Sequence, residues 1–437
     1  MSLTQKKKLR NKISTLVKKY SDLEFKKSKF IAGKTTIPPT GKVIGDLELQ
    51  NMVEASLDGW LTAGRFNNEF EKKLANFIGI KQLITANSGS SANLIAFSTL
   101  TSPKLKERAI KPGDEVISVA AGFPTTINPI VQFGAVPVFV DVKIPTYNID
   151  ENAIEEAITS KTKAIMIAHT LGNPFNLKAI KSICEKYNLW LIEDSCDALG
   201  STYENQMVGT FGDLATLSFY PAHHITMGEG GAVFTNSIKL KMIAQSYRDW
   251  GRDCFCEPGM ENTCGKRYDW KLGDLPRGYD HKYIYSHAGY NMKITDMQAA
   301  CGLAQLSRVK DFIKSRKNNF KYIYNNLKSH EDFLILPRAT ENSDPSWFGF
   351  PITLRDNLLI TRTDLLRHLD KKKIGTRLLF SGNVTKQPYM LNKKFRVVGN
   401  LKNTTNIMNN TFWIGLYPGL THQQLDFVTD QIKKFVK

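Results

Sequence analysis

Long apolar runs are absent from this chain of 437 residues. No segment approaches the roughly 20 consecutive apolar residues that a membrane-spanning helix needs. The N-terminus also lacks the apolar core of a secretory signal, so we expect a cytoplasmic protein that does not bind membranes. Internal repeats and low-complexity tracts are absent too. With 42% apolar and 10% aromatic residues, the chain can bury a core large enough for more than one domain.

Acidic residues are few relative to basic ones: 41 Asp and Glu face 59 Lys and Arg, a net charge of +18. Half of this excess lies in residues 1–34, which hold eleven basic and two acidic residues. Apolar residues recur there at helical spacing, at Leu9, Ile13, Leu16 and Tyr20. The pattern predicts a basic helical leader, residues 1–44, packed on the body or on a second subunit. No nucleic-acid motif accompanies the charge, which would also suit an anionic sugar-nucleotide substrate.

Cysteine pairs of the C-x2-C type are absent, although the chain has six cysteines. Four follow the spacing C-x57-C-x-C-x7-C: Cys196, Cys254, Cys256 and Cys264. The other two, Cys184 and Cys301, lie in apolar, helical surroundings. A cytosolic protein is not expected to use a disulfide framework. The spacing alone leaves buried thiols, a zinc ion and an iron–sulfur cluster open. Cys196 follows Asp194 by two residues, and in an extended stretch it would lie roughly 7 Å along the same face.

The middle of the chain alternates short apolar runs with helix-compatible segments. The expected strands are 83–86, 115–119, 136–140, 164–168 and 190–194. This order predicts a largely parallel α/β sheet covered by helices. A long polar helix near 305–330 and a strand at 348–354 then predict a smaller α+β unit. We expect a large domain at 45–309 and a small C-terminal domain at 310–437.

Small residues follow the first of these strands, in the stretch Asn87-Ser88-Gly89-Ser90-Ser91-Ala92-Asn93. Such residues let backbone amides at the start of a helix approach a phosphate. The same turn often serves only as a helix cap, so alone it is weak evidence.

A second stretch, Ser218-Phe219-Tyr220-Pro221-Ala222-His223-His224-Ile225-Thr226-Met227-Gly228-Glu229-Gly230-Gly231, is more specific. It resembles the segment SFxPxKxxTxGEGG of the sugar aminotransferase and dehydratase family of fold-type-I pyridoxal phosphate enzymes. Other family landmarks occur in order: Lys111-Pro112-Gly113-Asp114-Glu115, Gly134-Ala135-Val136-Pro137-Val138, Glu193-Asp194 and Gly289-Tyr290-Asn291. The resemblance covers about residues 45–430 and implies an aspartate aminotransferase-like fold.

The resemblance also implies a role for each matching position. The phosphate cradle would be formed by Gly89, Ser90, Ser91 and Ser218. Phe123 would stack on the cofactor ring, and Asp194 would pair with its pyridine nitrogen. Asp197 stands where many members have Gln or His in the cofactor site. Asn291 resembles a phosphate contact from a neighbouring subunit, which implies a homodimer with shared active sites.

His223 stands where the aminotransferases of this family have the lysine that tethers the aldehyde cofactor. An imidazole cannot form that tether but is a competent base near neutral pH. The substitution therefore favours proton abstraction over amino transfer. It points to a dehydratase on an aminotransferase scaffold, with Tyr220 and His224 as neighbouring candidates for an assisting acid.

The four spaced cysteines and His223 together resemble one branch of the family, the CDP-6-deoxy-L-threo-D-glycero-4-hexulose 3-dehydrases. That branch implies pyridoxamine phosphate and a [2Fe-2S] cluster on Cys196, Cys254, Cys256 and Cys264. The implied substrate is a CDP-4-keto-6-deoxyhexose, dehydrated at C3 on the way to 3,6-dideoxyhexoses of lipopolysaccharide. A cluster carries one electron at a time. No G-x-G-x-x-G element in a βαβ setting indicates NADH binding by this chain, so an NADH-dependent flavin and iron–sulfur reductase is the expected partner.

Two other hypotheses remain open at this point. An ordinary sugar aminotransferase shares the fold, but would need a lysine at position 223. A non-enzymatic iron–sulfur electron carrier or DNA-binding regulator would account for the cysteines and the charge. An electron carrier or a DNA-binding regulator, however, would not require the set formed by Asp194, Phe123 and the phosphate loop.

Overall fold

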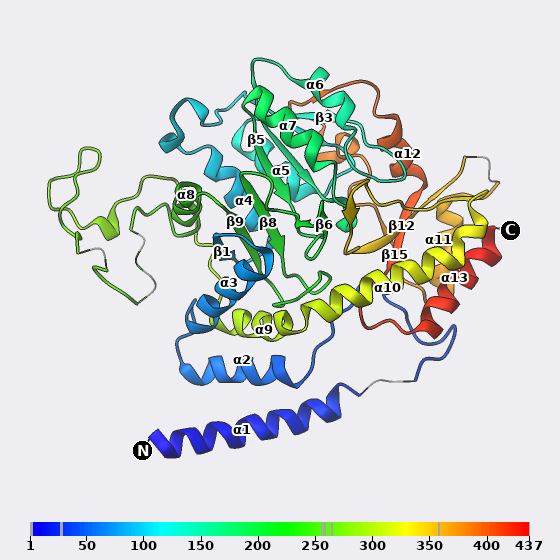
Figure 1. Ribbon diagram of the computed structural model, residues 1–437, viewed down its shortest axis with the longest axis horizontal. Coiled ribbons are helices and arrows are strands. Elements are labelled where there is room, and N and C mark those ends of the chain that lie inside the picture. Colours follow the sequence, from blue (N-terminus) through cyan, green and yellow to red (C-terminus); the bar gives the residue numbers. More distant parts are fainter. Residues whose placement is uncertain are drawn as a thin grey trace.

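The computed structural model describes residues 3–26, 29–254, 256, 259–263, 265–356 and 359–436. An eight-stranded sheet forms its centre (Figure 1). The strands lie in the order β1 (Gln82–Ala86), β9 (Gly231–Thr235), β8 (Leu214–Ser218), β5 (Trp190–Asp194), β4 (Thr162–Ala168), β2 (Glu115–Val119), β3 (Val136–Val140) and β14 (Arg396–Val397). Only β9 runs antiparallel to its neighbours.

Alternate residues of the central strands point to opposite faces of the sheet and belong to two separate hydrophobic clusters. Val116 and Ile192 point to one cluster, and Ile117 and Leu191 to the other. Both faces of the sheet are therefore covered, which explains the continuous apolar runs of its strands. The covering helices include α4 (Gly89–Leu100), α5 (Pro124–Phe133), α6 (Ile154–Ala157), α7 (Leu177–Tyr187) and α8 (Ile238–Arg248).

A second, antiparallel sheet lies in the C-terminal part, with strand order β10-β12-β15-β13. Its strands are β10 (Leu334–Ile335), β12 (Gly349–Leu354), β15 (Thr411–Gly415) and β13 (Arg377–Leu378). Helices α10 (Val309–Leu327), α11 (Arg362–Lys371) and α13 (His422–Val436) share its hydrophobic cluster. A small third sheet joins β11 (Ser343–Asp344), β6 (Thr202–Tyr203) and β7 (Gln206–Met207).

The expected strands and the long polar helix all form, and the fold-type-I architecture is confirmed. The domain limits at 45, 309 and 310 stay predictions. Strand β14 returns from the C-terminal part to pair with β3, and α12 (Lys402–Asn410) follows it. Short 3₁₀ turns complete the chain at Pro103–Arg108, Glu151–Ala153, Thr170–Gly172, His281–Tyr283, Lys328–His330, Val384–Lys386 and Pro388–Met390.

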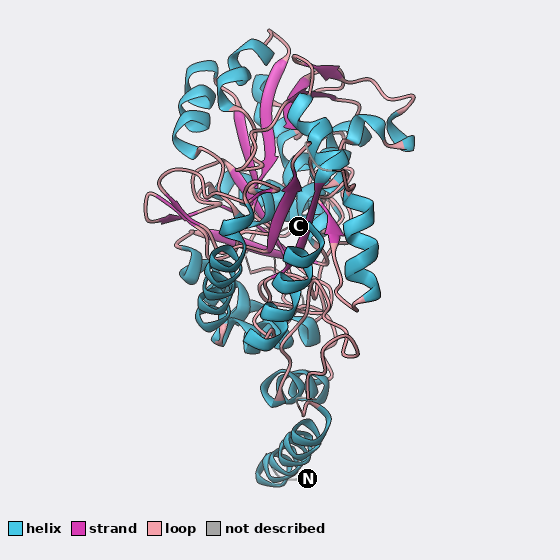
Figure 2. Cartoon of the chain, turned by 90° about the vertical axis from the view of Figure 1, so that its right-hand side faces the viewer, coloured by secondary structure: helices cyan, strands magenta, loops and turns pink. Residues whose placement is uncertain are grey.

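The predicted N-terminal helix forms as α1 (Leu3–Glu24) and packs on α2 (Asp46–Asp58). Helix α2 in turn packs on α9 (Asp296–Ser307), as α3 (Arg65–Ile78) does. Figure 2 shows α1 at the end of the molecule farthest from the strands. A polar face makes the contact, because Arg10 donates to Glu54 at 2.5 Å and to Asp58 at 2.9 Å. The apolar residues predicted to pack are largely exposed to solvent in the single chain: Leu16 is 64% and Tyr20 59% exposed.

The segment from Asp249 to Asn291, called the arm below, connects α8 to α9. Figure 1 shows it extending away from the central sheet on the left of the view. Isolated bridges pair its two ends, Asp249 with Asn291 and Arg252 with Tyr285. Among the described residues, no helix is long and apolar enough to cross a membrane.

Candidate active site

Two neighbouring strands carry predicted site residues to the same edge of the large sheet. Strand β5 ends at Asp194 and β8 ends at Ser218, and the two strands are parallel. Helix α4 begins beside them at Gly89. The carboxyl edge of a parallel sheet is where α/β folds bind their ligands, and the predicted site residues Asp194, Ser218 and Gly89 lie at this edge.

The phosphate cradle depends on close contact between Gly89 and Ser218. A Cβ atom on Gly89 would lie 2.4 Å from the Ser218 Cβ, so only glycine allows this approach. Ser88 caps the helix, because its Oγ accepts from the Ser91 amide at 3.0 Å. The remaining first-turn amides of an α-helix have no partner within the helix. With the hydroxyls of Ser90, Ser91 and Ser218 nearby, this end of α4 suits a phosphate.

Asp194 is held rigidly at the floor of the site and is only 4% exposed. Its Oδ2 accepts from Asn93 Nδ2 at 2.8 Å and from Thr126 Oγ1 at 2.7 Å. Its Oδ1 accepts from the Cys196 amide at 3.1 Å. Three donors fix the orientation of the carboxylate, as pairing with a pyridine nitrogen requires. Sequence patterns gave no sign of Asn93 or Thr126, because their roles arise only from folding.

His223 lies in the loop after β8, and its Nδ1 is 3.2 Å from Asp197 Oδ1. The two atoms are within ion-pair distance, although the buried Nδ1 does not meet the angular requirement of a hydrogen bond. The ring packs at 5.2 Å, centroid to centroid, against Phe348. Burial raises the pKa of Asp197, and the neighbouring His223 partly counteracts this shift. Asp197 is therefore placed to orient the imidazole.

Arg316 supports this loop from α10 and is only 1% exposed. Its guanidinium donates to four main-chain carbonyls, those of Ala222, His223, Trp347 and Phe348, at 3.0–3.5 Å. Burial lowers the pKa of Arg316 to about 10, which leaves it cationic at neutral pH. Its charge also favours the ionised form of Asp197. No sequence motif marked this arginine, since it lies within an ordinary polar helix.

His224 is buried and makes a structural contact with the main chain. Its Nε2 lies 2.7 Å from the Ser346 carbonyl oxygen, to which it donates. Burial, and then the Arg316 charge, hold the pKa of His224 well below its usual range. A neutral imidazole bound in this way is a poor proton donor. Tyr220, the other candidate acid, is 52% exposed and so remains accessible to a bound substrate.

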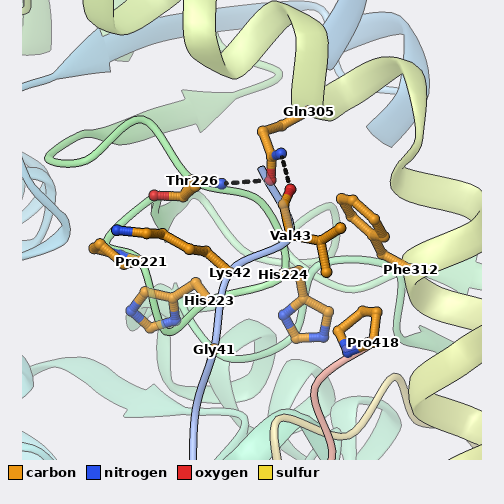
Figure 3. Close-up of a pocket in the computed structure, with 10 residues that line it drawn as sticks. All are labelled: Gly41, Lys42, Val43, Pro221, His223, His224, Thr226, Gln305, Phe312 and Pro418. Carbon is orange, nitrogen blue, oxygen red and sulfur yellow. Dashed lines mark hydrogen bonds between the residues drawn. The ribbon is translucent and has the colours of Figure 1, made fainter. Parts of the chain in front are cut away.

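A small pocket lies beside both histidines (Figure 3). Lys42 and Gln305 line it together with His223 and His224, and its volume of about 10 Å³ admits roughly one water molecule. A larger cavity of about 240 Å³, beside Arg108 and Asp213, contains none of the predicted site residues. The cofactor position predicted from the sequence lies at Asp194, Ser218 and Gly89, and neither cavity is lined by these residues.

Phe123 and Asn291 lie at open surfaces. Phe123 precedes α5, is 48% exposed, and makes an edge contact with Phe380 at 5.9 Å. A ring face is thus available for stacking. Asn291 is exposed at the base of the arm, where its Oδ1 accepts from Lys293 at 2.7 Å. Their predicted contacts with ring and phosphate stay predictions.

The predicted cluster ligands lie in two separate places. Cys196 follows Asp194 in a turn, because its amide bonds back to the carboxylate, so the extended arrangement expected from the sequence is wrong. Burial raises the pKa of the Cys196 thiol well above its usual range. Cys254 and Cys256 lie in the arm, where their sulfur atoms and a ring nitrogen of the buried His281 are within 4.8 Å of one another. Cys264 is outside the described residues.

Comparison with known proteins settles the family. Residues 43–433 match the model of the DegT/DnrJ/EryC1/StrS aminotransferase family. The chain belongs to this family. It is 66% identical to the lipopolysaccharide biosynthesis protein RfbH of Salmonella typhimurium over 98% of each chain. It is also 52% identical to dTDP-4-dehydro-2,6-dideoxy-D-glucose 3-dehydratase of Saccharopolyspora spinosa, over 93% of this chain and 88% of that one.

Solved structures of the family have the same fold. The E. coli GDP-4-keto-6-deoxy-D-mannose-3-dehydratase with bound hydrated PLP superposes with a TM-score of 0.82 at 29% identity, covering 92% of this chain and 99% of that one. The family uses the pyridoxal phosphate type of cofactor, and the cradle, Asp194 and Phe123 of this chain fit such a group.

Proposed function

We propose that this enzyme removes the C3 hydroxyl of a CDP-4-keto-6-deoxyhexose, using pyridoxamine phosphate, in 3,6-dideoxyhexose synthesis for lipopolysaccharide. The observation that carries the proposal is His223, an untethered base paired with Asp197 at the position of the family lysine. The relatives support it: RfbH takes part in lipopolysaccharide biosynthesis, and the other two relatives are 3-dehydratases of 4-keto-deoxy sugar nucleotides.

The described residues fit the cofactor at both of its ends. The amides at the start of α4 and the Ser218 hydroxyl would hold the phosphate, and Asp194 would hold the ring nitrogen. When bound, pyridoxamine phosphate supplies an amine for the C4 ketone and a ring that can store an electron pair. Asp194 strengthens that ring as an electron acceptor by keeping its nitrogen protonated.

His223 moves the proton in this proposal. Asp197 lies 3.2 Å from Nδ1 and orients the ring, so that Nε2 can take a proton from the C4′ carbon of the cofactor. Hydroxide is a poor leaving group, so an acid must assist its departure from C3. His223 can return its proton, and Tyr220 is the neighbouring alternative.

Reduction of the dehydrated sugar needs two electrons that this pocket does not supply. We assign their delivery to a [2Fe-2S] cluster on Cys196, Cys254, Cys256 and Cys264, fed by an NADH-dependent flavin and iron–sulfur reductase. Support comes from the cysteine spacing and from the Cys254, Cys256 and His281 group in the arm. A homodimer is part of the same proposal.

The untethered site can be tested directly. The wild-type protein loaded with pyridoxal phosphate, treated with borohydride and analysed by mass spectrometry should show no cofactor adduct. His223→Lys should show an adduct on the peptide that contains residue 223. An adduct on any lysine of the wild-type chain, Lys42 beside the histidines included, would contradict the proposal and favour the aminotransferase.

A further inference from the structure

The larger cavity, of about 240 Å³, lies at the amino edge of the large sheet, beside Arg108 and Asp213. Asp213 directly precedes β8, and Leu191 lies at the start of β5. These two strands are parallel, and their far ends carry Ser218 and Asp194. A strand of this length spans about 13 Å. The cavity is therefore separate from the candidate active site, and the proposed function does not use it.

Hydrogen bonds from the main chain hold the wall of this cavity. The Leu191 amide donates to Asp213 Oδ2 at 2.9 Å, and the Asp213 amide donates to the Leu191 carbonyl at 2.9 Å. The preceding residues Phe211 and Gly212 donate their amides to Oε1 of the buried Glu193, at 2.9 and 2.6 Å. The cavity is thus a preformed feature of the fold, as the sites of small ligands usually are.

Two exposed cations line the cavity, Arg108 and Lys181. The Arg108 guanidinium carbon lies 3.4 Å from the centroid of the Trp190 ring, which holds the side chain in place. Within the described ranges, no carboxylate lies within ion-pair distance of Arg108. Lys181 reaches only Glu185, at 4.0 Å on the surface of α7, and such a pair contributes little. Both cations are therefore available to an anionic group.

Asp213 supplies the opposite charge and is partly buried. Burial raises the pKa of Asp213, while the Leu191 amide and then Arg108 favour its ionised form. In the part of the chain that the structure describes, no donor reaches its Oδ1. A carboxylate withdrawn from water is costly unless a donor meets it. Burial also raises the pKa of the neighbouring Cys184 thiol to about 12, so this thiol is a neutral part of the lining.

We propose that this cavity binds a small zwitterion, an α-amino acid with an apolar side chain. Its ammonium group would donate to Asp213, and its carboxylate would accept from Arg108 and Lys181. Its side chain would pack on the apolar part of the lining, which includes Leu189 and Phe211. The volume is below the roughly 300–1,000 Å³ of pockets for drug-sized ligands, which favours a ligand smaller than a sugar nucleotide. The proposal is independent of the proposed function.

Calorimetric titration of the full-length protein with three matched probes tests this site. L-leucine carries both charges, isopentylamine lacks the carboxylate, and 4-methylpentanoate lacks the ammonium group. L-leucine should bind saturably, and each of the other two should bind about tenfold more weakly or worse, because it loses one charge-assisted hydrogen bond. No cofactor or substrate is needed, so the result does not depend on the reaction that the enzyme catalyses.

Variants assign the two charges. Arg108→Met and Asp213→Asn should each weaken L-leucine binding about tenfold or more. Arg108 is exposed, so its loss leaves the fold intact even if Asp213→Asn unfolds. Lys186→Met, on α7 but outside the lining, is the matched control and should bind L-leucine like the wild type.

Three results would overturn the proposal. The first is no saturable binding of L-leucine by the wild-type protein. The second is unchanged binding of L-leucine in Arg108→Met. The third is binding of isopentylamine or 4-methylpentanoate as tight as that of L-leucine, which would leave a site for a single charge.

Discussion

In the pocket, Asp194 accepts three hydrogen bonds and the buried Arg316 donates to four main-chain carbonyls, whereas in the arm the charged groups pair near the surface. Arg267 donates to Asp280 and Glu261 there, and Glu261 is more than half exposed. A buried network loses much when one member is removed, while a surface pair contributes little. The hydrogen bonds of Asp194 and Arg316 therefore hold the pocket in one geometry, whereas the ion pairs of the arm contribute little to its stability.

The largest expected effect is on the base. His223→Asn should reduce C3 dehydration by about 10²–10⁴-fold, the range for loss of a positioned general base. Binding of pyridoxamine phosphate, followed by absorbance, should persist because Asp194 and the cradle are unchanged. His224→Gln is the matched control, since a glutamine amide can still donate to the Ser346 carbonyl. Equal losses in the two variants would contradict the role of His223.

The second largest effect is expected on stability, from removal of the buried Arg316 guanidinium. Arg316→Met should lower the free energy of unfolding by about 2–3 kcal/mol, because buried carbonyls of Ala222, His223 and Phe348 lose a donor. Lys317→Met, the next residue on α10, removes only an exposed pair with Asp344 and should cost less than about 1 kcal/mol. Thermal and denaturant unfolding would compare the two. If they are equally stable, the loop does not depend on Arg316.

A smaller effect is expected in the pH dependence of the dehydration rate, on its acidic side. Asp197 faces His223, Arg316, Asp194 and Cys196, and burial raises its pKa above the usual aspartate range. Because the ionised carboxylate orients His223, the dehydration rate should fall as the pH drops through this raised pKa. Arg316→Met removes a positive charge that favours the ionised form of Asp197. The fall of the dehydration rate should therefore begin at a higher pH in this variant. An unchanged pH dependence would show that Asp197 does not control the base.

Much of the fold was predictable because the strands of a doubly covered sheet are continuous apolar runs. The candidate cofactor residues could be proposed from the sequence for a different reason, since a family segment such as that around His223 carries its chemistry in consecutive residues. Asn93, Thr126 and Arg316 could not be predicted, because they act through contacts with residues 31 to 101 positions away in the chain, which no local pattern encodes. The turn at Cys196 was missed as well, since a side-chain bond to Asp194 decided it.

In the proposed function, the pocket catalyses dehydration and the arm cysteines serve only in reduction. Solvent-oxygen exchange at C3 tests this separation most directly. Cys254→Ser with Cys256→Ser should leave ¹⁸O exchange from water into the substrate hydroxyl measurable with pyridoxamine phosphate, while formation of the 3-deoxy sugar with reductase and NADH is lost. Cys301→Ser, a buried thiol outside the arm, should keep both activities. Deoxysugar formation at the wild-type rate in the arm variant, or loss of exchange together with reduction, would contradict the account.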